Sequence, residues 1–238
     1  MIHSNTDSST DSLLISKTNH CSSQTNNTDN SSSFAIKPAE GKPRSQSMRK
    51  STSSYFVPKP ALALDLDETL IYASPIQINP DSIPIRVNRR RMYVQFRPGL
   101  CEFLKRVQKL YDVFIFTASR QEYANQIIDN LFDIDIKECR RFFRDSCLNV
   151  SGYSVKDLSI LRTPLKKTLL VDDIAGSALK HPRNLVRIRS WQGEKEDDVL
   201  LGQLMPLLEQ LAFENDLSQS SADFLKKYEY DGLSTFKS

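Results

Sequence analysis

Hydrophobic residues in this chain gather into short runs that are separated by segments of helical period. Four runs are largely apolar over four positions, too apolar for half-exposed strands, and we expect them to form central strands. They are Ala61–Leu64, Val113–Phe116, Thr168–Val171 and Leu185–Ile188, with Arg141–Phe143 as a weaker fifth candidate. Strands that alternate with helices predict an α/β fold with a Rossmann-like, largely parallel sheet flanked by helices.

Three helices are expected beside these strands. The first follows an Arg97-Pro98-Gly99 turn and places its apolar residues on one face, namely Leu100, Phe103, Leu104, Val107 and Leu110. The second should begin at Ser119, which has Glu122 at capping-box spacing. The third should run from about Asp197 to Ala212, with a kink or break at Pro206.

The amino-acid composition changes along the sequence and divides the chain into three parts. Residues 1–57 are rich in Ser, Thr and Asn and poor in large apolar side chains, so we expect a disordered leader. Residues 58–212 carry the alternating pattern and are long enough for one α/β domain. Residues 213–238 are polar again, and we expect a tail with one short helix around Ala222–Tyr228.

Composition excludes several classes of protein. A net charge of +3 is too small to indicate direct binding of nucleic acid. The four cysteines show no C-x-x-C spacing, which disfavours a zinc ribbon or a redox motif. Of the three histidines only His181 lies in the expected core, which disfavours a histidine-based triad. The sequence has no run of eighteen apolar residues, so we expect no transmembrane segment. We therefore expect an intracellular monomer, nuclear or cytoplasmic, with free thiols.

Chemically active residues stand directly after three of the predicted strands. They are Asp65-Leu66-Asp67-Glu68-Thr69, Thr117-Ala118-Ser119 and Asp172-Asp173. In parallel α/β sheets ligands bind beyond the carboxyl ends of the strands, so these side chains are candidates for one site. Asp65 and Asp67 project to the same side because side chains of an extended chain alternate.

Clustered carboxylates need counter-charge. Like charges within a few ångströms do not all stay ionised alone, and oxygen-only ligands suit Mg²⁺, which also accepts a phosphate oxygen. A nearby lysine would complete the neutralisation, and Lys156 is the candidate, ahead of Lys166 and Lys167.

Together these segments resemble the haloacid dehalogenase (HAD) superfamily, in its NLI-interacting-factor-like branch, and most closely the small phosphatases that act on the C-terminal domain of RNA polymerase II. The resemblance covers roughly residues 58–211. It rests on Asp65-Leu66-Asp67-Glu68-Thr69-Leu70, Arg97-Pro98-Gly99, Phe116-Thr117-Ala118-Ser119, Phe143-Arg144-Asp145-Ser146-Cys147, Val155-Lys156-Asp157-Leu158-Ser159, Asp172-Asp173, and His181-Pro182 leading to Ser190-Trp191.

The resemblance implies a HAD fold and a two-step phosphatase reaction. Asp65 would attack phosphorus to form an aspartyl-phosphate, and Asp67 would act first as acid and then as base. Thr117 would bind a phosphoryl oxygen and Lys156 would offset its charge. Asp65, the backbone carbonyl of Asp67 and Asp173 would hold Mg²⁺, and Asp172 would support them.

The short connections around the site leave no room for a large cap domain, which favours a phosphorylated protein as the substrate. A small β insertion is expected from the apolar residues Ile76, Ile78, Ile83, Ile85, Val87 and Val94. Arg144 and Tyr123 match family positions that contact the peptide. Arg120, Asp173 and Ala175 depart from the polymerase-tail phosphatases, which have an apolar residue, an asparagine and a proline there.

The sequence therefore predicts a Mg²⁺-dependent phosphoserine/phosphothreonine protein phosphatase, with the polymerase C-terminal domain as one candidate substrate and Arg144, Tyr123 and Arg120 as substrate-binding residues. Two alternatives stay open: a catalytically silent scaffold that binds phosphoproteins, and a HAD phosphatase that acts on metabolites.

Overall fold

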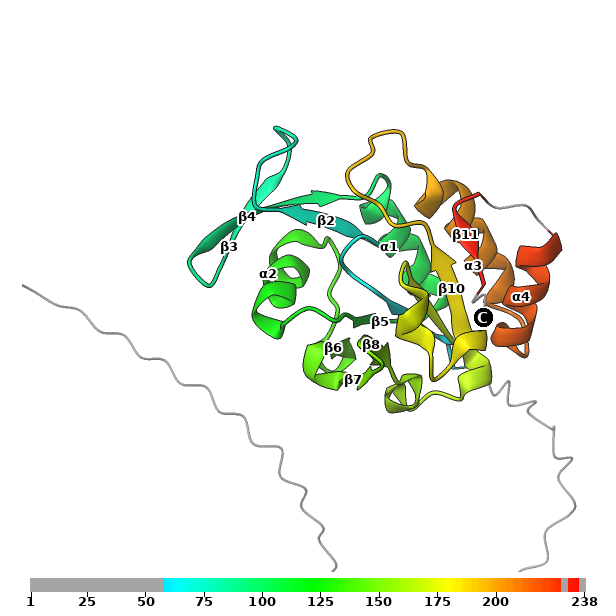
Figure 1. Cartoon of the computed structure of the whole chain (residues 1–238). Helices are drawn as coiled ribbons and strands as arrows, with labels where there is room; N and C mark the ends of the chain where they lie inside the picture. The colour runs from blue at the N-terminus through cyan, green and yellow to red at the C-terminus, as the bar shows by residue number, and fades with distance from the viewer. Residues whose placement is uncertain (1–57, 228–230, 236–238) are drawn as a thin grey trace, which may run out of the picture. The chain divides into compact units, whose positions relative to one another are not determined.

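The computed structural model describes residues 58–227 and 231–235, and the expected leader, residues 1–57, lies outside this part. A six-stranded sheet forms its centre (Figure 1), with the strand order β11-β10-β9-β1-β5-β6. These strands are β1 (Ala61–Leu64), β5 (Asp112–Phe116), β6 (Arg141–Phe142), β9 (Thr168–Asp172), β10 (Leu185–Ile188) and β11 (Leu233–Ser234). All five expected runs are strands, and they pair in parallel.

Strand order places a topological switch point at β1. The chain moves from β1 to β5 and β6 on one side, and later to β9 and β10 on the other side. Residues that follow β1 and β9 therefore face the crevice where an open α/β sheet binds its ligands.

The two faces of β1 belong to two separate cores. Leu62 and Leu64 pack into a large core with the helices α1 (Leu100–Leu110), α2 (Gln121–Leu131), α3 (Met205–Leu211) and α4 (Leu217–Lys227). Ala61 and Ala63 face a smaller core that is closed by short 3₁₀ turns, Leu158–Leu161 and Ala175–Ala178. Alternation of side chains along the strand produces this division.

Helix α1 starts where the sequence predicts, and Gly99 explains why. Its backbone is left-handed, with φ of 78°, and a Cβ at this position would lie 2.6 Å from the Leu201 side chain. Only glycine accepts both constraints without strain. Helix α2, in contrast, begins at Gln121 with Arg120 as its N-cap residue, so the expected capping box at Ser119 is wrong.

The C-terminal region is more structured than its composition suggests. A π-helical turn, Val199–Leu204, leads into α3, and Pro206 lies at the start of that helix, where its missing N–H is tolerated. Helix α4 packs against α3, and β11 pairs with β10 in antiparallel fashion. Leu217 and Leu233 are buried. These contacts extend the folded domain past residue 212, where we expected a polar tail to begin.

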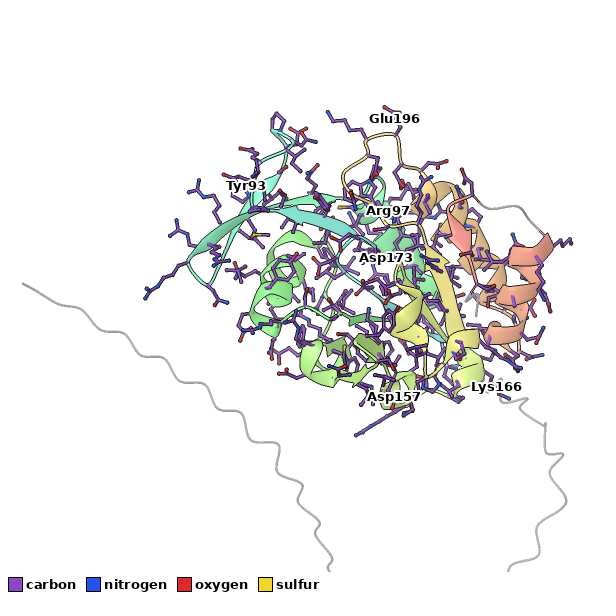
Figure 2. All side chains as sticks on the ribbon, viewed as in Figure 1. Tyr93, Arg97, Asp157, Lys166, Asp173 and Glu196 are labelled. Carbon is purple, nitrogen blue, oxygen red and sulfur yellow. The ribbon has the colours of Figure 1, made fainter. Side chains whose placement is uncertain are left out.

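Small β elements make up the insertion near the site. β2 (Ile71–Ser74), β4 (Arg90–Phe96) and β3 (Ile83–Val87) form a three-stranded sheet, which carries Tyr93 away from the main sheet (Figure 2). Ile76 and Ile78 lie outside its strands and are exposed, against expectation. A second hairpin joins β7 (Cys147–Val150) to β8 (Tyr153–Lys156). Within residues 58–227, no insertion larger than these two small sheets separates the strands and helices of the main fold. This agrees with the expected lack of a large cap domain.

Within the described ranges, none of the helices has the length and apolar character that a bilayer crossing requires.

Candidate active site

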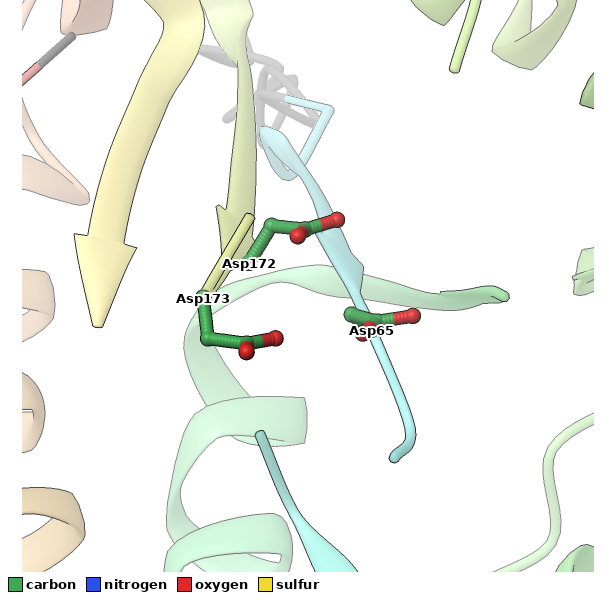
Figure 3. A group of neighbouring side chains, drawn as sticks. All are labelled: Asp65, Asp172 and Asp173. Atoms are coloured by element: carbon green, nitrogen blue, oxygen red, sulfur yellow. The ribbon is translucent and has the colours of Figure 1, made fainter. Parts of the chain in front are cut away.

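Three carboxylates converge at the carboxyl ends of β1 and β9. Asp65 directly follows β1, Asp172 ends β9, and Asp173 comes next along the chain (Figure 3). One oxygen from each lies within 4.8 Å of the other two. Hydrogen bonds between β1 and β9 extend to Asp65, whose N–H donates to the Val171 carbonyl at 3.0 Å. The parallel register of these two strands therefore brings the acids together.

Lys156 lies between two of these acids. Its Nζ donates to Asp65 Oδ1 at 2.6 Å and to Asp172 Oδ2 at 2.5 Å, and the residue is only 2% exposed. Burial alone would lower the pKa of Lys156, but Asp172 and Asp65 raise it above its ordinary value, so the ammonium is charged. Lys167 instead donates to the Glu214 carbonyl, away from the site.

One ammonium does not balance three buried acids. Burial raises the pKa of Asp65 well above its usual range, against the attraction of Lys156, and burial together with Asp172 raises the pKa of Asp173. A divalent cation would relieve this excess of negative charge, and converging carboxylate oxygens are the donors that Mg²⁺ prefers. The residues present therefore fit a Mg²⁺ ion held by Asp65 and Asp173, with Asp172 beside them.

Hydrogen bonds from neighbouring groups fix the orientation of Asp172 and Asp173. The Thr69 hydroxyl donates to Asp173 Oδ1 at 3.2 Å, and the N–H of Ile174 donates to Asp172 Oδ1 at 2.8 Å. Such outer contacts restrict the carboxylates to positions from which they can act together.

Asp67 lies apart from the three converging carboxylates. The Ser119 hydroxyl donates to its Oδ2 at 2.6 Å, and the Tyr123 hydroxyl donates to its Oδ1 at 2.5 Å. Ser119, which belongs to one of the candidate segments but was given only a capping role, thus contacts Asp67 directly. Tyr123, expected to contact a peptide, has its hydroxyl directed at Asp67. The expected metal contact of Asp67 involves its backbone carbonyl, whereas both oxygens of its side chain accept hydrogen bonds from these hydroxyls.

Thr117 follows β5 and is buried. Its hydroxyl oxygen accepts a hydrogen bond of 3.0 Å from the N–H of Ser119, so it helps to shape the turn that places Ser119 against Asp67. The hydroxyl hydrogen is free to donate in another direction, because a hydroxyl donates and accepts at once.

A cleft of about 900 Å³ opens beside Asp67. It is lined by residues of the β3–β4 hairpin, of α2 and of the segments before and after it; these include Val87, Arg90, Met92, Ser119, Arg120, Glu122, Tyr123 and Arg144. All three residues that we expected to bind substrate, Arg120, Tyr123 and Arg144, therefore face one space. Arg144 is held there by a hydrogen bond of 2.7 Å from its Nε to the Ala118 carbonyl.

Two further networks support the site and were missed by the sequence analysis. Arg97 pairs with Asp197 in the interior and also donates to the backbone carbonyl of Thr69. Asp157, next to Lys156, accepts hydrogen bonds from Lys180 and Ser159 and contacts His181. Apart from the contact between Ser159 and Asp157, these pairings have no local signal, because the partners lie far apart in sequence.

Comparison with known proteins gives a consistent family. Residues 60–218 match the family model described as NLI interacting factor-like phosphatase. A probable C-terminal domain small phosphatase of Dictyostelium discoideum is 42% identical over 155 residues, which cover 63% of this chain and 50% of the relative. The human carboxy-terminal domain RNA polymerase II polypeptide A small phosphatase 2 is 37% identical over 163 residues, covering 67% of this chain and 59% of the relative.

Another relative is phosphatase PSR1 of Saccharomyces cerevisiae, 37% identical over 67% of this chain and 38% of its own length. The solved structure of Fcp1, an essential RNA polymerase II CTD phosphatase, covers 73% of this chain and 55% of its own, with a TM-score of 0.45 and 21% identity. The chain thus spans about half the length of the curated relatives that it matches. The family match, over most of the domain and including every segment that forms the site, shows that the chain belongs to the NLI interacting factor-like phosphatase family.

Proposed function

We propose that this domain is a Mg²⁺-dependent phosphoserine/phosphothreonine protein phosphatase in which Asp65 becomes phosphorylated. One observation carries the proposal: at the switch point of the sheet, Asp65 is held by Lys156 beside Asp172 and Asp173, with Asp67 two residues further on. The names of the relatives support the reaction class, and the arrangement of the acids supports the roles that the resemblance implies.

In the first step, a carboxylate oxygen of Asp65 attacks the phosphorus, and the bond from phosphorus to the serine or threonine oxygen breaks. Asp67 gives a proton to this departing oxygen. In the second step, Asp67 takes a proton from a water molecule, which attacks the phosphorus and releases inorganic phosphate and Asp65. The reaction divides one difficult displacement into two.

The surrounding side chains position and neutralise these groups. Lys156 offsets charge on Asp65 and on the phosphoryl oxygens, and the Thr117 hydroxyl donates to one of those oxygens. Ser119 and Tyr123 hold the Asp67 carboxylate in place. When bound, Mg²⁺ supplies electrostatic stabilisation of the phosphoryl group. Most of the catalysis is then positioning and electrostatics, as is usual for phosphoryl transfer.

An open cleft rather than an enclosed cavity favours a phosphorylated side chain of a protein over a small metabolite. The relatives make phosphopeptides of the polymerase C-terminal domain the first substrates to assay. Arg120 in the cleft makes an apolar pocket for a proline less favourable, so we place serine/threonine phosphatase activity ahead of polymerase specificity.

Phosphate release from a panel of phosphopeptides and sugar phosphates tests the proposal, with Mg²⁺ and with a chelator. We expect turnover of the peptides by the wild type with Mg²⁺, and loss by at least a thousandfold in Asp65→Asn. Asp81→Asn, which changes an exposed acid outside the site in the same way, should match the wild type. A silent scaffold would show no turnover, and faster turnover of sugar phosphates would indicate a metabolite phosphatase.

A further inference from the structure

The β3–β4 hairpin presents two different faces. Val87 and Arg90 are paired across the hairpin, and both line the cleft together with Met92, two residues further along β4. Arg86 and Arg91 form the adjacent cross-strand pair, and neither lines the cleft. Because side chains alternate along each strand, Arg90 points to the cleft side while Arg86 and Arg91 point to the opposite side.

The opposite wall of the cleft contributes two more arginines. Arg120 stands at the N-cap of α2, and Arg144 begins the turn Arg144–Ser146. In the part of the chain that the structure describes, the recorded ion pairs involve none of Arg90, Arg120 and Arg144. Three separate elements thus direct guanidinium groups, without acidic partners, toward one space.

Acidic residues in the cleft are concentrated at its catalytic end. Asp67 accepts hydrogen bonds from Ser119 and Tyr123, and Glu68 follows it directly. Glu122 is the remaining acid of the lining. Glu122 lies near Arg120 and Arg144, so we expect an anion to be bound by direct contact with the guanidinium groups, which form charge-assisted hydrogen bonds with carboxylates and phosphates.

We propose that Arg90 and Arg120 bind a second anionic group of the peptide, a carboxylate or a further phosphate close in sequence to the phosphorylated residue at Asp65. This inference rests on the proposed function and specifies its substrate class: acidic or multiply phosphorylated segments of proteins. Arg144 lines the same cleft and adds a third positive charge to it.

The test compares kcat/KM for three phosphopeptides that share one phosphoserine. The first has neutral flanking residues, the second has aspartates on both sides, and the third has a second phosphoserine. We expect the wild type to prefer either anionic peptide by at least about tenfold. This preference should fall at least fivefold in the double variant Arg90→Gln/Arg120→Gln, and it should weaken as salt rises.

The matched control is Arg86→Gln/Arg91→Gln, which removes the same charge from the same hairpin on its other face. It should keep the wild-type preference and its folding, because like charges facing each other across strands do not stabilise a hairpin. Thermal unfolding verifies that both double variants are folded. If Arg90→Gln/Arg120→Gln does not fold, the single variants Arg90→Gln and Arg120→Gln are assayed in its place.

The outcomes separate this inference from the proposed function. Turnover of all three peptides at equal kcat/KM would overturn the inference alone, whereas no turnover of any of them would overturn the proposed function. Equal loss of preference in both double variants would indicate general attraction by net charge and contradict a local site. Binding to anionic phosphatidylserine vesicles that depends on Arg90 and Arg120, without peptide preference, would assign the arginines to a membrane surface and also overturn the inference.

Discussion

The guanidinium of Arg97 and the carboxylate of Asp197 meet through two parallel hydrogen bonds of 2.8 Å, and both side chains are essentially closed to solvent. Another guanidinium nitrogen, Nη1, donates to the backbone carbonyls of Thr69 and Arg189. Arg97 therefore joins the segment after β1 to the segment after β10 and to the start of the C-terminal helices. Burial alone would raise the pKa of Asp197, but the hydrogen bonds from Arg97 lower it.

Replacing Arg97 with alanine should lower the free energy of unfolding by about 3 kcal/mol, because the buried Asp197 carboxylate would keep only one ion pair, its longer, 3.2 Å contact with Arg189. Arg97→Lys should recover only part of this loss, since an ammonium does not reproduce the planar fork. Arg106→Ala, which removes a partly exposed pair with Glu209, should cost less than about 1 kcal/mol. Denaturant unfolding measures all three, and an Arg97→Ala loss as small as that of Arg106→Ala would refute the structural role.

Mg²⁺ should stabilise the domain through the converging carboxylates. At ten times the dissociation constant, we expect a gain of about 1.4 kcal/mol in the free energy of unfolding. Asp173→Ala should need at least tenfold more Mg²⁺ for the same gain, whereas Asp81→Ala should behave like the wild type. Thermal unfolding over a Mg²⁺ titration provides the measurement. A response of Asp173→Ala at the same Mg²⁺ concentrations as the wild type would place the cation elsewhere.

Asp157 should give the domain a pH-dependent contribution to stability. Burial alone would raise its pKa, but hydrogen bonds from His181, Lys180 and Ser159 lower it below the ordinary range. Since a lowered pKa favours the ionised form in the folded state, the contribution is present above pH of about 4 and is lost as the pH falls through the folded value. Asp157→Asn should therefore be less stable by about 1 kcal/mol at pH 7.

Below pH of about 4 the difference in the free energy of unfolding between the wild type and Asp157→Asn should become smaller, because Asp157 of the wild type then becomes protonated. Unfolding experiments at a series of pH values test this, with Asp81→Asn as the control. A difference that stays constant from pH 7 to pH 3 would mean that the network of Asp157 does not depend on its charge.

Ser119 and Tyr123 should act by positioning Asp67. Ser119→Ala and Tyr123→Phe each remove one hydrogen bond to its carboxylate, and we expect kcat to fall by about tenfold in each. The kcat of the double variant should be higher than the product of the two single losses predicts, because both hydroxyls act on the Asp67 carboxylate. Tyr93→Phe, on the insertion, is the control. An unchanged kcat with a raised KM in Tyr123→Phe would instead support the expected contact with the peptide.

The sequence predicted the main strands and the clustering of acids because both follow local rules. Alternation and apolar runs located β1, β5, β9 and β10, and the strand-end rule then identified Asp65, Asp172 and Asp173 as neighbours. The need for counter-charge made Lys156 a candidate, and the resemblance to a family supported it, although no periodic pattern links the β7–β8 hairpin to the sheet.

Predictions failed where a distant contact outweighed a local signal. Ser119 has capping-box spacing to Glu122, yet its hydroxyl bonds Asp67, 52 positions away in the sequence. The short helix expected around Ala222–Tyr228 is present as α4, but it begins earlier, at Leu217, and β11 was not expected; contacts with α3 and β10 hold these two elements. Ile76 and Ile78 are apolar but exposed, which the alternation of strand residues alone does not foresee.

The stereochemical course at phosphorus tests the central claim, a phosphorylated Asp65, most directly. Hydrolysis of a phosphopeptide analogue with a chiral, isotopically labelled thiophosphate requires no accumulation of an intermediate. Two successive in-line displacements, first by Asp65 and then by water, predict overall retention of configuration. Inversion would show that water attacks the substrate directly and would contradict the account.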